Sequence, residues 1–272
     1  METPNDPKFN PYRPAETGTP ALTEGAQNAA AAYVPDGRTV AAGEGLEWLV
    51  AAWRLFVAAP VMWMVMVVLY AVFMLVLAFV PVVGTLFGFL LYGVISAGWL
   101  AGAAAVAHGE NLELDHLFAG LKGKPAPLFV LGACYAAGLI AITLLVIIAL
   151  AVGLASSGLF STIMSGSLPD VTALMGALVV VLLGLALVAP LLAALWFAPA
   201  LVYFHDVPPT KALKVSFRAC LNNLLPFLVY GVLLLLLFLI AAIPFGLGLL
   251  VVGPLAFISA YTSYRSVFAE GA

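Results

Sequence analysis

The sequence predicts an all-α membrane protein: a polytopic helix bundle with six transmembrane helices arranged as three hairpins, and with interfacial amphipathic helices between the hairpins. Of its 272 residues, 64% are hydrophobic and 8% are charged, whereas an average soluble domain has roughly 45–50% apolar and 25% charged residues. The apolar residues gather in six long runs, and none of the ten lysines and arginines falls in the central part of any run. A soluble fold needs a more polar surface than this, so the bilayer is the solvent that fits the composition.

Residues 1–45 are expected to form a disordered cytoplasmic tail. The segment holds six prolines and few branched apolar residues, so it has little to bury in a core. It lacks the basic start and the apolar centre of a signal peptide. A solvated leader and a docking segment for a partner are both compatible with this composition.

Residues 46–57 (LEWLVAAWRLFV) predict an amphipathic helix, because apolar side chains recur there at helical spacing. Glu47 and Arg54 fall elsewhere on that helix. We expect it to lie in the headgroup layer, with Trp48 and Trp53 at interface depth. The predicted apolar stripe consists of Leu46, Leu49, Val50, Trp53 and Val57.

The membrane domain is expected to cover residues 46–268. A crossing needs about 20 residues at a rise of about 1.5 Å each, so each apolar run is long enough. Short Pro/Gly joints at 80–84 and 243–246 are typical of tight turns and predict hairpins. The six spans are placed near 58–80, 84–107, 127–155, 173–204, 224–243 and 246–266.

The fourth run is long enough to extend about 48 Å if straight, which exceeds the ~30 Å hydrocarbon layer. Two interpretations follow. Either Pro190 and Pro199 kink the helix, or its end projects beyond the lipid as a stalk. In the second run, Gly98 and Gly102 form a G-x-x-x-G pattern that allows helices to approach closely.

The distribution of positive charge predicts the orientation. Under this span assignment the bases all fall on one side, and the opposite loops carry none. By the positive-inside rule, both termini are therefore cytoplasmic. The bases are Lys8, Arg13, Arg38, Arg54, Lys122, Lys124, Lys211, Lys214, Arg218 and Arg265.

A threefold repeat is visible around the segments that precede the first, third and fifth spans. Residues 114–122 (LDHLFAGLK) align with 46–54 (LEWLVAAWR), and residues 210–218 (TKALKVSFR) align more weakly. The repeating unit is then an interfacial helix followed by a transmembrane hairpin. Each copy ends on one base: Arg54, Lys122 and Arg218. These bases could form a phosphate-binding ring, or act as three separate headgroup anchors.

Lys211, Lys214 and Arg218 share one helical face, at i, i+3 and i+7. Such a basic stripe suits anionic lipid headgroups, at roughly 1 kcal/mol per base near the surface. Membrane lipids are therefore the expected partners, together with a membrane protein partner as a second class. Nucleic-acid binding would need a far larger excess of bases than ten against thirteen acids.

The sequence offers no catalytic constellation, so we expect a non-enzymatic protein without a cofactor. Walker, GxSxG, HExxH and CxxC patterns are absent. Residues 108–116 gather two histidines and three acids, but their spacing fits helix capping better than a metal site. Cys134 and Cys220 are interpreted as packing thiols rather than as a disulfide.

The stretch WFAPALVYFHDVPPTKALKVSFRACLNNLLPFLVYG (196–231) resembles a family of uncharacterised proteobacterial multi-pass inner-membrane proteins. The resemblance extends over about 44–268. It is looser to the membrane domain found fused to some glycerophosphodiester phosphodiesterases, whose catalytic domain this chain does not carry. The resemblance implies an inner-membrane location and a helical fold, and it brings no catalytic residues.

Two functions follow as hypotheses. The first is a non-enzymatic inner-membrane protein that acts through lipid or protein contacts at the cytoplasmic face, as the basic amphipathic segments indicate. The second is a transporter or channel-like protein for a neutral or lipidic solute, which internal repeats and proline-broken helices favour. A cavity near the bilayer midplane would distinguish the second from the first.

Overall fold

The computed structural model describes residues 33–123, 125–156, 164 and 171–269. The regular elements among them are helices, and the β structure in this part of the chain is one isolated bridge between Tyr33 and Ala269. The all-α class is therefore confirmed. The elements are α2 (Glu44–Ala58), α3 (Pro60–Ala78), α4 (Val83–Leu90), α5 (Tyr92–Ala107), η1 (Leu114–Phe118), α6 (Ala119–Lys122), α7 (Pro125–Ser156), α9 (Val171–Trp196), α10 (Ala198–His205), α11 (Pro209–Asn222), α12 (Leu224–Ala242) and α13 (Leu249–Phe268).

Within the described residues, four helices are long and apolar enough to cross a membrane. They are Pro60–Ala78, Pro125–Gly153, Leu174–His205 and Leu224–Ala242. Helices α4 and α5 pass the same test together, although they are bent by 46° where they meet, so they make a fifth span if they cross as one. At most 17% of the most apolar window in any of the four is buried. These helices thus turn apolar side chains outward, as lipid-facing helices do.

The structure therefore gives four or five candidate spans where six were expected. The expected sixth span, 246–266, corresponds to α13, which is long enough but less apolar than the others. Helices α2, α3, α5 and α12 pack around α13, and its second half is almost entirely buried. Its hydroxyl side chains are satisfied inside the body; Thr262 Oγ1, for example, donates to the Trp48 carbonyl at 2.8 Å. Helix α13 thus behaves as a core helix.

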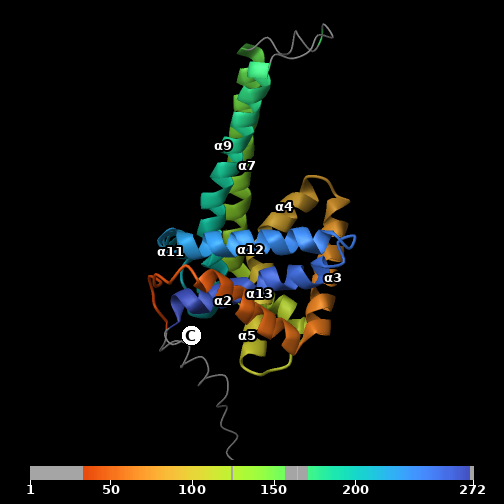
Figure 1. Ribbon diagram of the computed structural model, residues 1–272, viewed down its shortest axis with the longest axis vertical. Coiled ribbons are helices and arrows are strands. Elements are labelled where there is room, and N and C mark those ends of the chain that lie inside the picture. The colour runs from red at the N-terminus through yellow and green to blue at the C-terminus, as the bar shows by residue number, and fades with distance from the viewer. Residues whose placement is uncertain (1–32, 124, 157–163, 165–170, 270–272) are drawn as a thin grey trace, which may run out of the picture.

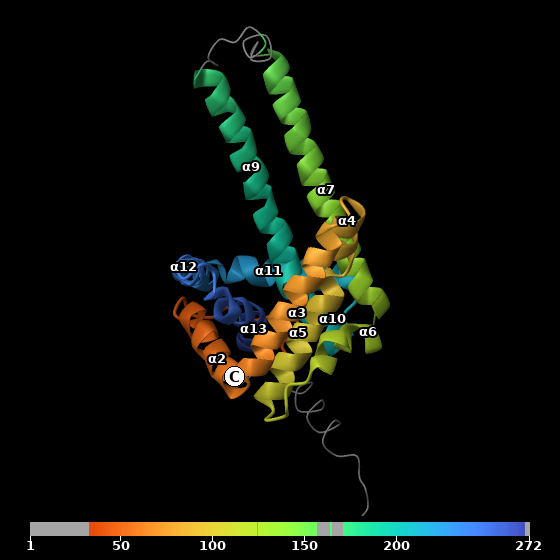
Figure 2. The ribbon, with the colours of Figure 1, turned by 90° about the vertical axis from the view of Figure 1, so that its right-hand side faces the viewer.

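The α7–α9 pair projects as a long hairpin from a compact body formed by the other helices (Figures 1 and 2). Helix α12 crosses the foot of this hairpin in Figure 1 and is seen nearly end-on in Figure 2. Since the two views are related by a quarter turn, α12 runs across the α7–α9 hairpin rather than along it. The hairpins that the sequence predicts are therefore not parallel to one another.

Tight turns close the α3–α4 and α12–α13 connections. Val82 adopts φ 65° and Phe245 adopts φ 54°, a region that non-glycine residues rarely occupy. Next to the first turn, a Cβ on Gly84 would lie 1.9 Å from the Leu77 carbonyl oxygen. Glycine is thus required where α3 and α4 meet.

The core of the body is built around aromatic side chains. Trp48, Trp63 and Trp99 are at most 1% exposed. The Trp99 ring stacks on Phe257 with centroids 4.3 Å apart and on Trp63 with centroids 5.9 Å apart. Such ring pairs add about 0.5–1.5 kcal/mol each beyond burial. They join α3, α5 and α13 into one unit.

The G-x-x-x-G pattern of α5 is used within the chain. A Cβ on Gly98 would lie 2.5 Å from the Leu117 carbonyl oxygen, and one on Gly102 would lie 2.9 Å from Leu112 Cδ1. The two glycines therefore let the segment that carries η1 lie directly against α5.

Part of the expected tail is ordered. Residues 1–32 lie outside the described part of the chain, but residues 33–43 pack against the end of α13. The Val34 N–H donates to the Phe268 carbonyl at 2.9 Å. Asn223 fixes the same segment: its Oδ1 accepts a hydrogen bond from Val40 N–H at 2.8 Å, and its Nδ2 donates one to the Arg38 carbonyl at 3.0 Å. The buried side chain of Asn223 therefore fixes residues 33–43, a contact that amino-acid composition could not predict.

Candidate functional site

Helix α11 carries the basic stripe. Helix α10 ends at His205, before the left-handed Asp206 (φ 57°). Pro208 follows with an extended backbone (φ −54°, ψ 139°), and α11 begins at Pro209, where the missing N–H costs nothing. One face of α11 is buried, mainly against α9 and α10. The buried residues are small enough to allow a close approach: Ala212, Val215, Ser216, Ala219 and Cys220.

The three bases lie on the other side of α11. Lys211, Lys214 and Arg218 are exposed, and Leu213 and Phe217 are half-buried beside them. None of the three bases forms an ion pair within the described residues. The sequence-predicted stripe is thus a set of three cations on one helical face, held in place by the packing of the opposite face.

The other two candidate headgroup bases lie on separate elements. Arg54 is exposed on α2. Lys122 of α6 is also exposed, but it forms an ion pair with Asp115 of η1. A surface ion pair contributes about 0–1 kcal/mol, yet it neutralises the charge that a lipid phosphate would meet. Of the three bases of the proposed ring, Lys122 is therefore the least available.

Helix α2 has two apolar faces instead of one. Trp48, expected at the interface, is buried with its ring centroid 5.0 Å from Phe227 and 6.0 Å from Tyr230 of α12. Of the predicted stripe, Leu46, Trp53 and Val57 are about half exposed, whereas Leu49 is buried at 8% exposed. The outward face suits lipid contact, whereas the inward face fixes α2 against the body.

The helix that spans Leu174–His205 is interrupted at Phe197, between α9 and α10. Ser216 of α11 lies at this interruption. Its hydroxyl accepts a hydrogen bond from the Phe197 N–H at 3.0 Å and donates one to the Ala193 carbonyl at 2.7 Å. In an unbroken helix these two backbone groups would bond to each other, so the serine hydroxyl is inserted into the helical ladder.

The two candidate kink prolines have different surroundings. Pro199 is the second residue of α10, and because it has no N–H, the carbonyl of Leu195 loses its helical donor. The Tyr92 hydroxyl of α5 donates to that carbonyl at 3.2 Å. Pro190, in contrast, lies inside α9, which continues through it. The interruption in this helix therefore belongs to the Pro199 region.

Cys220 lies next to Ser216 and points its thiol at the same Ala193 carbonyl, at 3.4 Å. Burial raises the pKa of Cys220 to about 12, and the hydrogen bond with Ser216 opposes this shift only in part. The thiol therefore stays protonated at physiological pH and is a poor nucleophile. It is free of any disulfide, as is Cys134.

His116 has a structural role in the described part of the histidine- and acid-rich segment. Its Nδ1 accepts a hydrogen bond from the Glu113 N–H at 3.0 Å, which caps the start of η1. No group of three or more metal-ligating side chains occurs within the described residues.

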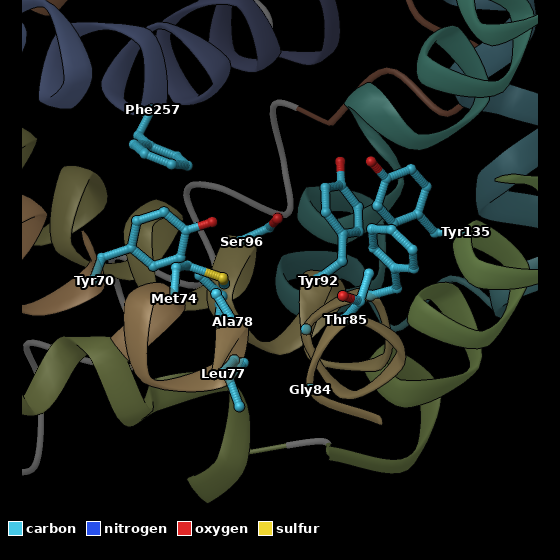
Figure 3. A pocket seen from close by; sticks show the side chains of 13 residues that line it. Tyr70, Met74, Leu77, Ala78, Gly84, Thr85, Tyr92, Ser96, Tyr135 and Phe257 are labelled. Atoms are coloured by element: carbon cyan, nitrogen blue, oxygen red, sulfur yellow. The ribbon is translucent and has the colours of Figure 1, made fainter. Parts of the chain in front are cut away.

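A half-open cavity of about 420 Å³ lies between α3, α4, α5, α7 and α13, and no sequence pattern predicts it. Figure 3 shows Tyr70 and Phe257 on one side of it and Tyr92 and Tyr135 on the other, with Ser96 between them. None of the thirteen residues that line it is charged. The tyrosines belong to three different spans, so only the tertiary arrangement brings them together.

The apolar, outward-facing helices and the cationic face of α11 define a multi-pass membrane protein. No family model matches the chain, and no solved structure matches it. The chain is 30% identical over 199 residues to a probable inner membrane protein of Burkholderia thailandensis. The aligned region covers 71% of this chain and 73% of the relative.

This chain therefore belongs to the same family of bacterial inner-membrane proteins as the Burkholderia relative. The sequence resemblance to a proteobacterial inner-membrane family is confirmed, and the location is a multi-pass one in the bacterial inner membrane.

Proposed function

We propose that this protein is non-enzymatic and binds anionic lipid headgroups at the cytoplasmic face of the inner membrane through α11. The observation that carries the proposal is the asymmetry of this helix. Its small residues are buried, while Lys211, Lys214 and Arg218 are exposed and form no described ion pair. The three cations are placed to bind the phosphate of a lipid headgroup, while the half-buried side chains of Leu213 and Phe217 can contact the acyl chains below it.

The test is a titration of the detergent-solubilised protein with short-chain phosphatidylglycerol. Three bases at roughly 1 kcal/mol each correspond to about a 100-fold loss of affinity when all three become Gln. The matched control is Lys122→Gln, because Lys122 is already paired with Asp115; we expect it to bind nearly as tightly as wild type. Equal affinity of the triple variant and wild type would remove the basis of this proposal.

The proposed topology has six spans and cytoplasmic termini. The one-sided distribution of the ten bases supports it. Four apolar helices and the bent α4–α5 pair are long and apolar enough for five of these crossings, and this topology requires α12, which lies across α7–α9 in Figure 1, to align with them in the bilayer. Helix α13 would supply the sixth, at the centre of the bundle, where its hydroxyl groups are satisfied by neighbouring helices.

A transporter or channel-like protein for a neutral or lipidic solute is the second candidate. The cavity between α3, α5, α7 and α13 favours it, since its lining is uncharged. The test is transfer of a fluorescent phospholipid between the leaflets of proteoliposomes. This candidate predicts transfer faster than in protein-free liposomes, and equal rates would contradict it.

A further inference from the structure

The cavity has the size and the lining of a ligand site. Its volume of about 420 Å³ lies within the ~300–1,000 Å³ typical of small-molecule pockets. Its walls are mostly apolar and aromatic, and its polar groups are the hydroxyls of Tyr70, Thr85, Tyr92, Ser96 and Tyr135. A few hydroxyls in an apolar cavity fix the orientation of a ligand that is itself mostly apolar.

The hydrogen-bond state of the tyrosines indicates what the ligand offers. The Tyr92 hydroxyl already donates to the Leu195 carbonyl. The hydroxyls of Tyr70 and Tyr135 have no hydrogen-bond partner within the described residues. Two tyrosine donors in an apolar site are best satisfied by an acceptor such as a carbonyl oxygen.

We propose that this cavity binds an ester-linked acyl chain of a membrane lipid. The ester carbonyl accepts a hydrogen bond from the hydroxyl of Tyr70 or of Tyr135, which lie on opposite sides of the cavity (Figure 3), and the chain packs along Met74, Leu77 and Phe257, which also line it. A charged headgroup does not fit inside, because the lining offers no counter-charge. The bilayer that the exposed faces of α3 and α7 would meet supplies acyl esters directly.

The acyl ester is proposed as the ligand of the same cavity that supports the transporter hypothesis, and its binding rests on that cavity alone. Binding of an acyl ester does not require its movement between leaflets. The binding test below can therefore succeed where the leaflet-transfer assay fails, and the two failures are distinguishable.

Gly88 provides a way to fill the cavity without disturbing the fold. A Cβ at this position would lie 3.7 Å from Leu77 Cδ1 and 3.9 Å from Met74 Sδ, both ordinary contacts. A leucine here therefore extends into the space that the acyl chain would occupy. Gly231 of α12 is the matched control, because a Cβ there meets nothing within 4 Å.

The experiment uses the full-length protein in nanodiscs that contain phosphatidylglycerol with a diazirine in one ester-linked chain. After photolysis, mass spectrometry measures labelling of the peptides that contain Met74 and Tyr135. We expect Gly88→Leu to reduce this labelling at least fivefold and Gly231→Leu to leave it unchanged. Unchanged labelling in Gly88→Leu would overturn the proposal.

A second comparison tests the carbonyl itself. An ether-linked lipid with the same chain and diazirine lacks the carbonyl acceptor, so we expect it to label the wild type about three- to tenfold less than the ester. The difference should vanish in the double variant Tyr70→Phe/Tyr135→Phe, which keeps the ring volumes. Equal ester and ether labelling of wild type would contradict the proposal. Displacement of the label by a prenylquinone but not by unlabelled ester lipid would also overturn it and assign the cavity to a quinone.

Discussion

At the scale of single residues, Ser216 shows how α11 is joined to the membrane helices. One hydroxyl bridges the Phe197 N–H and the Ala193 carbonyl, so the same residue belongs to the buried face of α11 and to the break in the α9–α10 helix. The position of the basic stripe and the geometry of the break are thereby coupled.

Replacement of Ser216 by alanine should weaken this coupling. The change leaves the buried Phe197 N–H without its partner and leaves the Ala193 carbonyl only the weak thiol donor of Cys220, which costs about 1–3 kcal/mol. We expect the variant to unfold at a lower temperature in detergent, whereas Thr39→Ala, at an exposed position, should unfold like wild type. An unchanged unfolding temperature for Ser216→Ala would show that the inserted hydroxyl contributes nothing.

Cys220 gives a pH-dependent test of the same contact. Burial raises the pKa of its thiol from 9.0 to about 12 in the folded protein, so the unfolded state loses the proton first as pH rises. The stabilisation is fully present below pH 9 and is lost between about pH 9 and pH 12, at up to about 1.4 kcal/mol per pH unit. Wild type should therefore lose stability relative to Cys220→Ala when chemical unfolding is measured at pH 8 and pH 10. Parallel pH profiles of the two proteins would contradict the burial of the thiol.

At the scale of elements, α2 shows what periodicity can and cannot predict. The 46–57 pattern correctly predicted a helix with an apolar stripe, and Leu46 and Trp53 do remain exposed on it. The pattern could not reveal that a second face, centred on Gly45 and Trp48, packs against α12. Glycine and tryptophan are compatible with either a membrane interface or a core, and only the partner helix decides between them.

The Gly45 contact can be tested by adding a single methyl group. A Cβ at Gly45 would lie 2.2 Å from the Pro226 carbonyl oxygen and 2.9 Å from the Tyr230 nitrogen, so the two helices must separate. Overpacking of this kind costs about 1–3 kcal/mol or more, and we expect Gly45→Ala to lower the unfolding temperature. Gly43→Ala, where a Cβ meets nothing within 4 Å, should leave that temperature almost unchanged; equal effects of the two changes would show that α2 does not approach α12 so closely.

At the scale of the whole molecule, composition was enough to predict an all-α membrane protein, because so few charges cannot cover a soluble fold. The number of spans was harder to predict. Length alone does not separate a helix that faces lipid from one inside the body: α12 and α13 are almost equally long, but α13 is less apolar and its second half is buried. The cavity could not be predicted either, since Tyr70, Tyr92 and Tyr135 are far apart in the sequence and each is unremarkable in its own helix.

The central claim is that the basic face of α11 lies on the cytoplasmic side and that the hairpin tips lie on the other. The most direct measurement is labelling of single-cysteine variants in intact spheroplasts with a membrane-impermeant maleimide, with Cys134 and Cys220 replaced by Ala. Val171→Cys, near the tip of α7–α9, and Phe245→Cys, in the α12–α13 turn, are at exposed positions, as is Lys214→Cys. We predict labelling at 171 and 245 in intact spheroplasts, and at 214 only after the membrane is permeabilised. Labelling of Lys214→Cys in intact spheroplasts would contradict the account.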